Sequence, residues 1–257
     1  MCYRLVSSLE CINEDQSLWG NKAVNLARIS KKGFPVPKGF VISSSLFHKY
    51  IEKKGQNTLN PFLVEMDNLL EKSIKTHELC MQELIFRSSA DIEGTISTSF
   101  CGIFDSSKFI NNKRLSDCLV SVWESTFGFA SKNYCSKIGI NLNMINMAVI
   151  VQEFFIGSVY GVIQTKNVIN SSDNIIIEYS DKSFDSVVSG KDNTSMLVMT
   201  RNNEVINNNC FFDLSNNQKK LLSDAAQSIE NEFLFPVEIE FSLEDDKLAI
   251  LQVRTLS

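Results

Sequence analysis

The sequence predicts an α+β protein with a helix-rich first half and a strand-rich second half. Apolar residues keep helical spacing over long segments of the first half, whereas shorter apolar or alternating segments, typical of strands, dominate the second half. A chain of 257 residues that is 44% hydrophobic can bury the core of one large domain or of two lobes. We expect two lobes, at residues 1–145 and 146–257.

Glycine, proline and serine mark the ends of the elements expected in the first half. Gly33 suits the position after a helix, and Pro35 and Pro37 enforce an extended connector behind it. Either Ser44 or Ser45 is expected to cap the next helix. The expected helices cover residues 20–32, 44–55, 61–75 and 114–137, and the expected strands cover residues 39–43 and 83–87. Residues 88–102 have the composition of a loop.

The second half combines strands with one amphipathic helix. The expected strands cover residues 147–152, 159–165, 174–179 and 195–200, and the helix covers residues 214–233. Residues 203–209 are rich in asparagine and are expected to form a surface turn. Two further strands, at residues 236–243 and 247–254, form a closing hairpin.

The closing hairpin concentrates polar groups in apolar surroundings. Glu238 and Glu240 alternate with apolar residues on one strand, and Gln252 and Arg254 share one face of the other. Such groups are rarely buried without a ligand or an ion to satisfy them. Hard oxygen ligands suit Mg²⁺, and a guanidinium suits a phosphoryl group. The alternative is an exposed edge with solvated charges.

Convergence of these four side chains depends on the register of the hairpin. Cross-strand neighbours share a face of a sheet. We therefore expect a three-residue loop at residues 244–246, with Leu243 opposite Lys247 and Glu238 opposite Gln252. A two-residue turn without a compensating bulge would separate the polar groups onto opposite faces.

Composition argues against several classes of partner and location. The formal net charge of -5 gives no electrostatic case for nucleic acid or an anionic membrane surface. We see no signal peptide and no apolar run long enough to span a bilayer. The seven cysteines include no C-x-x-C pair, and neither of the two histidines lies near a cysteine pair. Free thiols in a reducing cytoplasm are expected.

Three ordered motifs span nearly the whole chain. They are GNKAVNLA at residues 20–27 with GFPVPKGF at residues 33–40, RSSA at residues 87–90 leading to SFCG at residues 99–102, and the closing hairpin. Together they resemble the nucleotide-binding domain of phosphoenolpyruvate synthase and pyruvate, phosphate dikinase, which rifampin phosphotransferase shares. The resemblance implies an ATP-grasp fold, in which two lobes hold Mg-ATP in the cleft between them.

The resemblance also implies roles for residues of the first lobe. Lys22 would contact the nucleotide phosphates, although a solvated lysine is the alternative. Arg87 would clamp phosphate and offset charge during transfer, although a structural ion pair is the alternative. Gly102 and Ser106 would lie in a loop over the phosphates, the former because glycine allows close backbone approach. Gln152 would lie beside the adenine, and an ordinary polar residue at a strand end is the alternative.

On the closing hairpin, the resemblance assigns magnesium and phosphate contacts. Glu240 and Gln252 match magnesium-carrying positions, Arg254 matches a phosphate contact, and Glu238 stands where the family usually has Asp. Together these residues predict a site for ATP and Mg²⁺, with Glu238, Glu240 and Gln252 as the metal ligands and Lys22, Arg87 and Arg254 as the catalytic set.

The chain also departs from the family pattern. Asn21 replaces a glycine. The sequence stops where the nucleotide domain of the family would end, and we expect neither a phosphohistidine domain nor a phosphoenolpyruvate-binding domain in it. We expect an ATP-dependent phosphotransferase that acts on a small molecule or on a phosphohistidine domain in a separate chain. The alternatives are an ATP-grasp ligase that makes an acyl-phosphate and a catalytically silent nucleotide-binding or regulatory domain.

Overall fold

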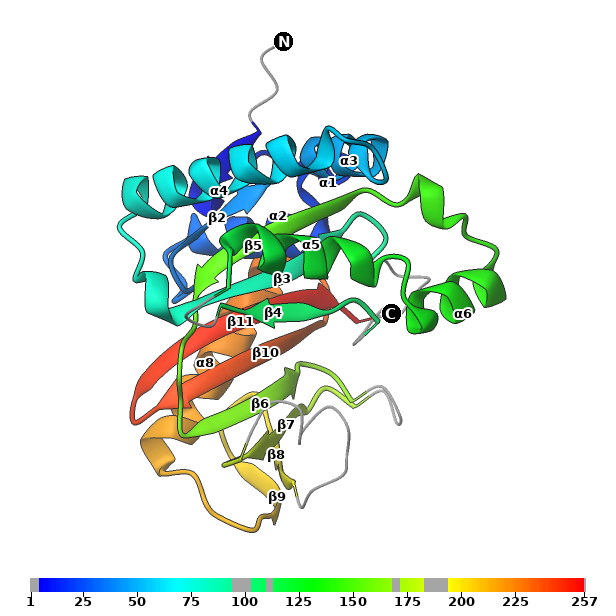
Figure 1. Ribbon diagram of the computed structural model, residues 1–257. Helices are drawn as coiled ribbons and strands as arrows, with labels where there is room; N and C mark the ends of the chain where they lie inside the picture. The colour runs from blue at the N-terminus through cyan, green and yellow to red at the C-terminus, as the bar shows by residue number, and fades with distance from the viewer. Residues whose placement is uncertain (1–4, 94–102, 110–112, 168–171, 183–193, 257) are drawn as a thin grey trace. The chain divides into compact units, whose positions relative to one another are not determined.

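The computed structural model describes residues 5–93, 103–109, 113–167, 172–182 and 194–256 (Figure 1). The chain divides into two compact units, and each contains one sheet. The first unit comprises residues 1–28 and 37–154, and the second comprises residues 29–36 and 155–257. The chain therefore passes from the first unit to the second after Phe154, while the expected lobe boundary at residue 145 stays a prediction.

The first unit is built on a five-stranded antiparallel sheet with the strand order β1-β2-β5-β3-β4. Its strands are β1 Val6–Ser8, β2 Gly39–Ile42, β3 Leu84–Ala90, β4 Ser106–Lys108 and β5 Met147–Glu153. Its helices are α1 Gln16–Trp19, α2 Asn21–Ser30, α3 Ser44–Lys53, α4 Leu59–Thr76, α5 Leu115–Ser125 and α6 Phe129–Ile138, with short 3-10 turns at Leu9–Cys11, Met81–Glu83 and Leu142–Met144. Helix α2 continues two residues beyond this unit.

The core of the first unit lies between its sheet and helices α3, α4 and α5. Phe40 and Phe86 from the sheet are fully buried with Met66 and Trp123 from the helices. The prediction of one helix over residues 114–137 was wrong, because Gly128 has an extended conformation (φ -67°, ψ 169°) and separates α5 from α6. Strands β1 and β4 were not predicted, because three residues are too few to show a period.

The second unit is built on a six-stranded antiparallel sheet with the strand order β11-β10-β6-β7-β8-β9. Its strands are β6 Val159–Gln164, β7 Ile175–Ser180, β8 Ser195–Met199, β9 Val205–Asn209, β10 Val237–Glu244 and β11 Lys247–Thr255. Helix α8 Asn216–Phe233 begins with a capping box between Ser215 and Gln218 and packs on β6 and β10.

The asparagine-rich segment differs from its prediction as a surface turn. Its residues 205–209 form the edge strand β9, which pairs with β8 although every residue of the strand is exposed. Val205 and Ile206 favour strands, and hydrogen bonding to the neighbouring strand outweighs the turn preference of the asparagines that follow. The expected α+β class is confirmed in both units.

Candidate nucleotide-binding residues

The closing hairpin has a shorter turn than expected. Asp245 and Asp246 alone connect β10 to β11, Glu244 lies opposite Lys247, and Asp245 has a φ of 52°. The expected three-residue loop was therefore wrong. A bulge compensates for it, because Phe241 lies opposite Ile250 while its neighbour Glu240 lies opposite Gln252.

The bulge brings the four predicted side chains to one face of the sheet. Leu251 is the extra residue, and beyond it the register changes by one position. Glu240 then faces Gln252 and Glu238 faces Arg254 across the two strands. The expected pairing of Glu238 with Gln252 was wrong, but the shared face that the metal-site argument requires is confirmed.

Glu238 is nearly buried and both of its carboxylate oxygens have partners. Only 9% of the residue is exposed. Its Oε1 accepts a hydrogen bond from Arg254 Nε at 2.7 Å and forms an ion pair with Arg254 Nη2 at 2.5 Å, and its Oε2 accepts a hydrogen bond from Gln164 Nε2 at 3.2 Å. These contacts offset the cost of burying the charge. Arg254, predicted as a phosphate contact, is held here by Glu238.

Gln164 is a site residue that the sequence analysis missed. It lies on β6 directly opposite Glu238 of β10. The alternation of residues 159–165 predicted the strand, but nothing in the sequence paired β6 with the closing hairpin. Glu240 is also nearly buried, at 8% exposure, and lies opposite Val162 of the same strand.

In the first unit, Lys22 forms an ion pair with another missed residue, Glu93. Lys22 Nζ lies 3.7 Å from Glu93 Oε2, and each side chain is only 10% exposed, so the solvated alternative for Lys22 was wrong. The Glu93 carboxylate accepts hydrogen bonds from Ser88 Oγ at 3.1 Å and from the backbone N–H of Ala90 at 3.2 Å. The position of Glu93, three residues after the RSSA motif, is the one feature of the sequence that could have pointed to it.

The start of α2 is tied to the end of β3. Ser89 Oγ accepts a hydrogen bond from Ala23 N at 3.0 Å and donates one to Trp19 O at 2.9 Å, so it satisfies a backbone donor in the first turn. Asn21 Nδ2 donates to Asp91 O at 2.7 Å and to Glu93 O at 2.8 Å. The asparagine that replaces the family glycine thus fixes the turn carrying Glu93 beside Lys22.

Two of the remaining predicted residues are neighbours in the sheet of the first unit. Arg87 on β3 is half-buried and lies opposite Ser106, an exposed residue of β4. Gln152 on β5 is 1% exposed, and its Nε2 donates to Pro37 O at 3.0 Å. Gly102 lies outside the described residues. The nucleotide contacts assigned to these four residues stay predictions.

The donor chemistry of the hairpin face fits a hard cation. Glu238 and Glu240 offer carboxylate oxygens, Gln252 offers an amide oxygen, and Mg²⁺ prefers oxygen ligands completed by water and phosphate. Nowhere in the described part of the chain do three or more His, Cys, Asp or Glu side chains form a potential metal cluster. The two glutamates would therefore supply only part of a coordination shell.

Two general features complete the description of the chain. The cysteines at positions 11, 80, 118, 135 and 210, which are those among the described residues, are free thiols. No helix in the described segments is long and apolar enough to cross a membrane.

Comparison with known proteins identifies the family. The structure defines an α+β protein. It carries a nearly buried lysine at the start of α2 and a bulged closing hairpin with polar side chains on one face. A family model described as "Pyruvate phosphate dikinase, AMP/ATP-binding domain" matches residues 62–210, more than half of the chain. The chain belongs to this family. Membership agrees with the resemblance of the three motifs and supports the expected ATP-grasp fold.

The chain is also similar to several longer proteins. It is 23% identical to the "Uncharacterized phosphotransferase YvkC" of Bacillus subtilis, over 95% of this chain and 34% of that protein. Identity is 27% with a "Probable phosphoenolpyruvate synthase" of Methanothermobacter thermautotrophicus, over 69% of this chain and 31% of that protein. It is 24% with the "Rifampicin phosphotransferase" of Bacillus cereus, over 93% and 34%. The chain spans about a third of the length of these relatives.

Among solved structures, the D-alanine–D-alanine ligase of Bacillus anthracis is 13% identical, over 92% of this chain and 56% of that chain, with a TM-score of 0.43. An L-amino acid ligase of Bacillus licheniformis is 12% identical, over 93% and 43%, with a TM-score of 0.44.

Proposed function

We propose that this chain is the nucleotide-binding part of an ATP- and Mg²⁺-dependent phosphotransferase. The observation that carries the proposal is the bulge of the closing hairpin, which brings Glu238, Glu240, Gln252 and Arg254 to one face of the sheet. A bulge that re-aims side chains is typical of a functional site. Membership in the family and the names of the longer relatives support the same reaction class.

Each unit would supply its own set of contacts. In the second unit, Glu238, Glu240 and Gln252 would hold the metal and Arg254 would bind a phosphate oxygen, with Glu238 also keeping the guanidinium in place. A bound Mg²⁺ neutralises charge on the phosphate oxygens during phosphoryl transfer. In the first unit, Lys22 and Arg87 would bind phosphate oxygens.

The acceptor would be a small molecule or a phosphohistidine domain in a separate chain. The product distinguishes the possible reactions, since a dikinase-type transfer releases AMP and phosphate, whereas a simple kinase or a ligase releases ADP. A ligase would additionally need a carboxylic acid substrate. Quantifying AMP, ADP and phosphate after incubation with ATP therefore tests the reaction class.

A catalytically silent nucleotide-binding domain is the second candidate. One observation favours it: two of the three basic residues assigned to phosphates already contact carboxylates, Lys22 with Glu93 and Arg254 with Glu238. A protein that binds Mg-ATP with no product formed in the presence of candidate acceptors would support this second function.

The binding experiment compares Glu240→Gln with Glu244→Gln. Glu244 is an exposed residue at the far end of the same strand, so its substitution removes the same charge from β10 away from the site. ATP affinity is measured by calorimetry with and without Mg²⁺. We expect the Mg²⁺-dependent part of the affinity to be lost in Glu240→Gln and kept in Glu244→Gln. Equal affinity of the unmodified protein in both buffers would refute the metal-dependent proposal.

A further inference from the structure

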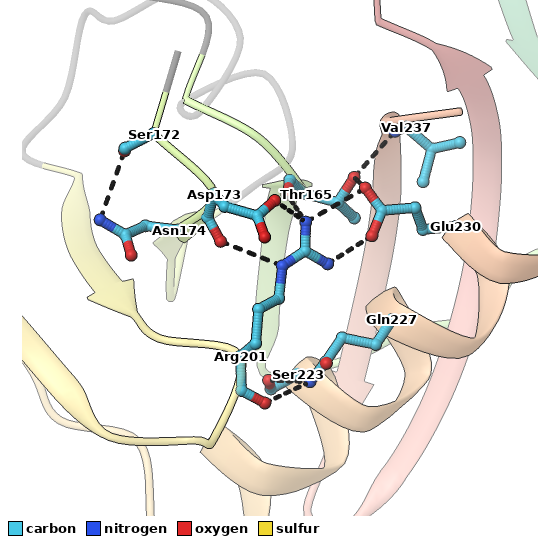
Figure 2. A network of polar contacts seen from close by, with 9 residues as sticks. All are labelled: Thr165, Ser172, Asp173, Asn174, Arg201, Ser223, Gln227, Glu230 and Val237. Atoms are coloured by element: carbon cyan, nitrogen blue, oxygen red, sulfur yellow. Dashed lines mark hydrogen bonds and ion pairs between the residues drawn. The ribbon is translucent and has the colours of Figure 1, made fainter. Parts of the chain in front are cut away.

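A second polar cluster lies on the helix side of the sheet in the second unit (Figure 2). Arg201, which follows β8, is at its centre. Its guanidinium contacts both carboxylate oxygens of Glu230 on α8, donates to Thr165 O at 2.5 Å, and donates to Asp173 O and Asp173 Oδ1 at 3.0 Å each. One arginine therefore joins the end of β6, the start of β7 and helix α8.

Thr165 connects this cluster to the closing hairpin. Its Oγ1 donates a hydrogen bond to Glu230 Oε1 at 2.7 Å and accepts one from the backbone N–H of Val237 at 2.9 Å. Thr165 N also donates to Val237 O at 3.0 Å. Thr165 is fully buried, and Val237 is the first residue of β10, immediately before Glu238.

The end of β6 thus contacts both faces of the sheet. Gln164 reaches the polar face and donates to Glu238 Oε2, while the adjacent Thr165 side chain reaches the helix face and contacts Glu230. Successive side chains of a strand point to opposite faces, so a shift at Thr165 moves Gln164 with it. Glu238 is then held through its own side chain by Gln164 and through the backbone of the preceding residue, Val237, by Thr165.

We propose that Thr165, Glu230 and Arg201 are positioning residues that fix the start of β10 and thereby the placement of Glu238 on the polar face. The inference rests on the proposed function, because it concerns how the metal- and phosphate-binding hairpin is held. A partly buried ion pair is weak evidence for stability by itself. Here the hydrogen bonds of the ion pair continue through Thr165 to β10, the strand that carries Glu238 and Glu240. A binding site needs its side chains held to within about 0.5 Å.

The electrostatics of the cluster agree with a fixed arrangement. Burial alone would lower the pKa of Arg201, but the hydrogen bonds and charges of Glu230 and Asp173 outweigh it and raise that pKa above its ordinary value. Arg201 therefore stays charged at any physiological pH.

The test compares Thr165→Val with Thr165→Ser. Valine keeps the shape of threonine but removes the hydroxyl that joins Glu230 to Val237 N–H, whereas serine keeps the hydroxyl. For each protein, the Mg²⁺ concentration that gives half-saturation is measured by calorimetry at fixed ATP, and ATP affinity is measured without Mg²⁺. Urea unfolding gives the stability of each variant.

We expect Thr165→Val to raise the half-saturating Mg²⁺ concentration about 3- to 10-fold, the scale of one lost hydrogen bond. ATP affinity without Mg²⁺ should fall by less than this factor, because Glu238 also holds Arg254. Thr165→Ser should bind Mg²⁺ like the unmodified protein. A Thr165→Val protein that is less stable but has an unchanged Mg²⁺ midpoint would show a purely structural role and overturn the inference.

Two further outcomes keep the test decisive. If Thr165→Val does not fold, Glu230→Gln takes its place, since it weakens the contact with Arg201 while keeping the shape of the side chain; the same midpoint shift is expected, and its absence refutes the inference. If the unmodified protein shows no Mg²⁺ dependence at all, the proposed function itself fails. A normal Mg²⁺ response of the unmodified protein with an unshifted variant refutes only the positioning role.

Discussion

Gly20→Ala should destabilise the first unit strongly, because Gly20 has a backbone that only glycine adopts easily and no room for a side chain. Its φ is 74° and its ψ is 157°. A Cβ added there would lie 1.9 Å from the carbonyl oxygen of Ser89 on β3. Backbone strain in this region costs about 1–3 kcal/mol, and forcing an extra carbon into a packed site costs about 1–3 kcal/mol. We expect a loss of about 2–6 kcal/mol.

Gly139→Ala is the matched control. Gly139 ends α6 in the same unit with a φ of 73°, but its ψ is 22° and no atom lies within 4 Å of an added Cβ. This substitution should therefore cost only the left-handed strain of about 1–2 kcal/mol. The difference between the two variants isolates the collision of residue 20 with β3.

Urea unfolding followed by tryptophan fluorescence measures both variants. The two tryptophans of the chain, Trp19 and Trp123, lie in the first unit, so the signal reports that unit. With a slope of about 2 kcal/mol per M, Gly20→Ala should lower the midpoint by about 1–3 M and Gly139→Ala by about 0.5–1 M. Equal shifts would refute the argument that Gly20 is required by its contact with Ser89. Because Gly20 immediately precedes α2, whose first turn carries Lys22, Gly20→Ala should also weaken ATP binding.

Two more outcomes follow from single side chains. Lys22→Ala and Arg87→Ala should each lower ATP consumption by about 10²- to 10³-fold while keeping the circular dichroism spectrum of the unmodified protein. The control Lys49→Ala removes an exposed lysine of α3 and should leave ATP consumption unchanged. If Lys22→Ala or Arg87→Ala unfolds, the replaced residue instead forms a structural ion pair. Burial raises the pKa of Tyr179 to about 12, above its ordinary value of about 10. The unfolded chain then ionises first, so stability is full below pH ~10 and falls as pH rises to ~12; Tyr179→Phe should remove that part of the alkaline loss in urea unfolding, and an unchanged pH profile would contradict the assignment.

The long elements were predictable from sequence because their apolar period is sustained. The expected helices at residues 61–75 and 214–233 are α4 Leu59–Thr76 and α8 Asn216–Phe233. The failures have local causes. The helical spacing around Gly128 continues across a break that only the glycine signals, and β9 forms because its backbone pairs with β8, a contact that no local pattern contains.

For the candidate site, the sequence predicted residues better than contacts. Lys22 and Glu238 were singled out from the sequence and both are nearly buried in the structure, but their partners Glu93 and Gln164 were not singled out. Both partners lie far from them along the chain, so they become neighbours only through the pairing of strands and the docking of a helix. Residue types and local periods carry no information on which distant strand comes to lie alongside.

The bulge in the closing hairpin shows where such information is nevertheless present in the sequence. The buried face of β10 must be matched on β11 by Leu248, Ile250 and Val253, whose numbers change from even to odd. No straight strand places all three on one face. The expected three-residue loop would have put Leu248 and Ile250 on the polar face together with Gln252. A two-residue turn buries both of them. The extra residue Leu251 then places Val253 in the core, and it places Gln252 and Arg254 on the face of Glu238 and Glu240. The polar site and the hydrophobic core thus require the same bulge, and the change of apolar parity along β11 is the pattern that predicts it.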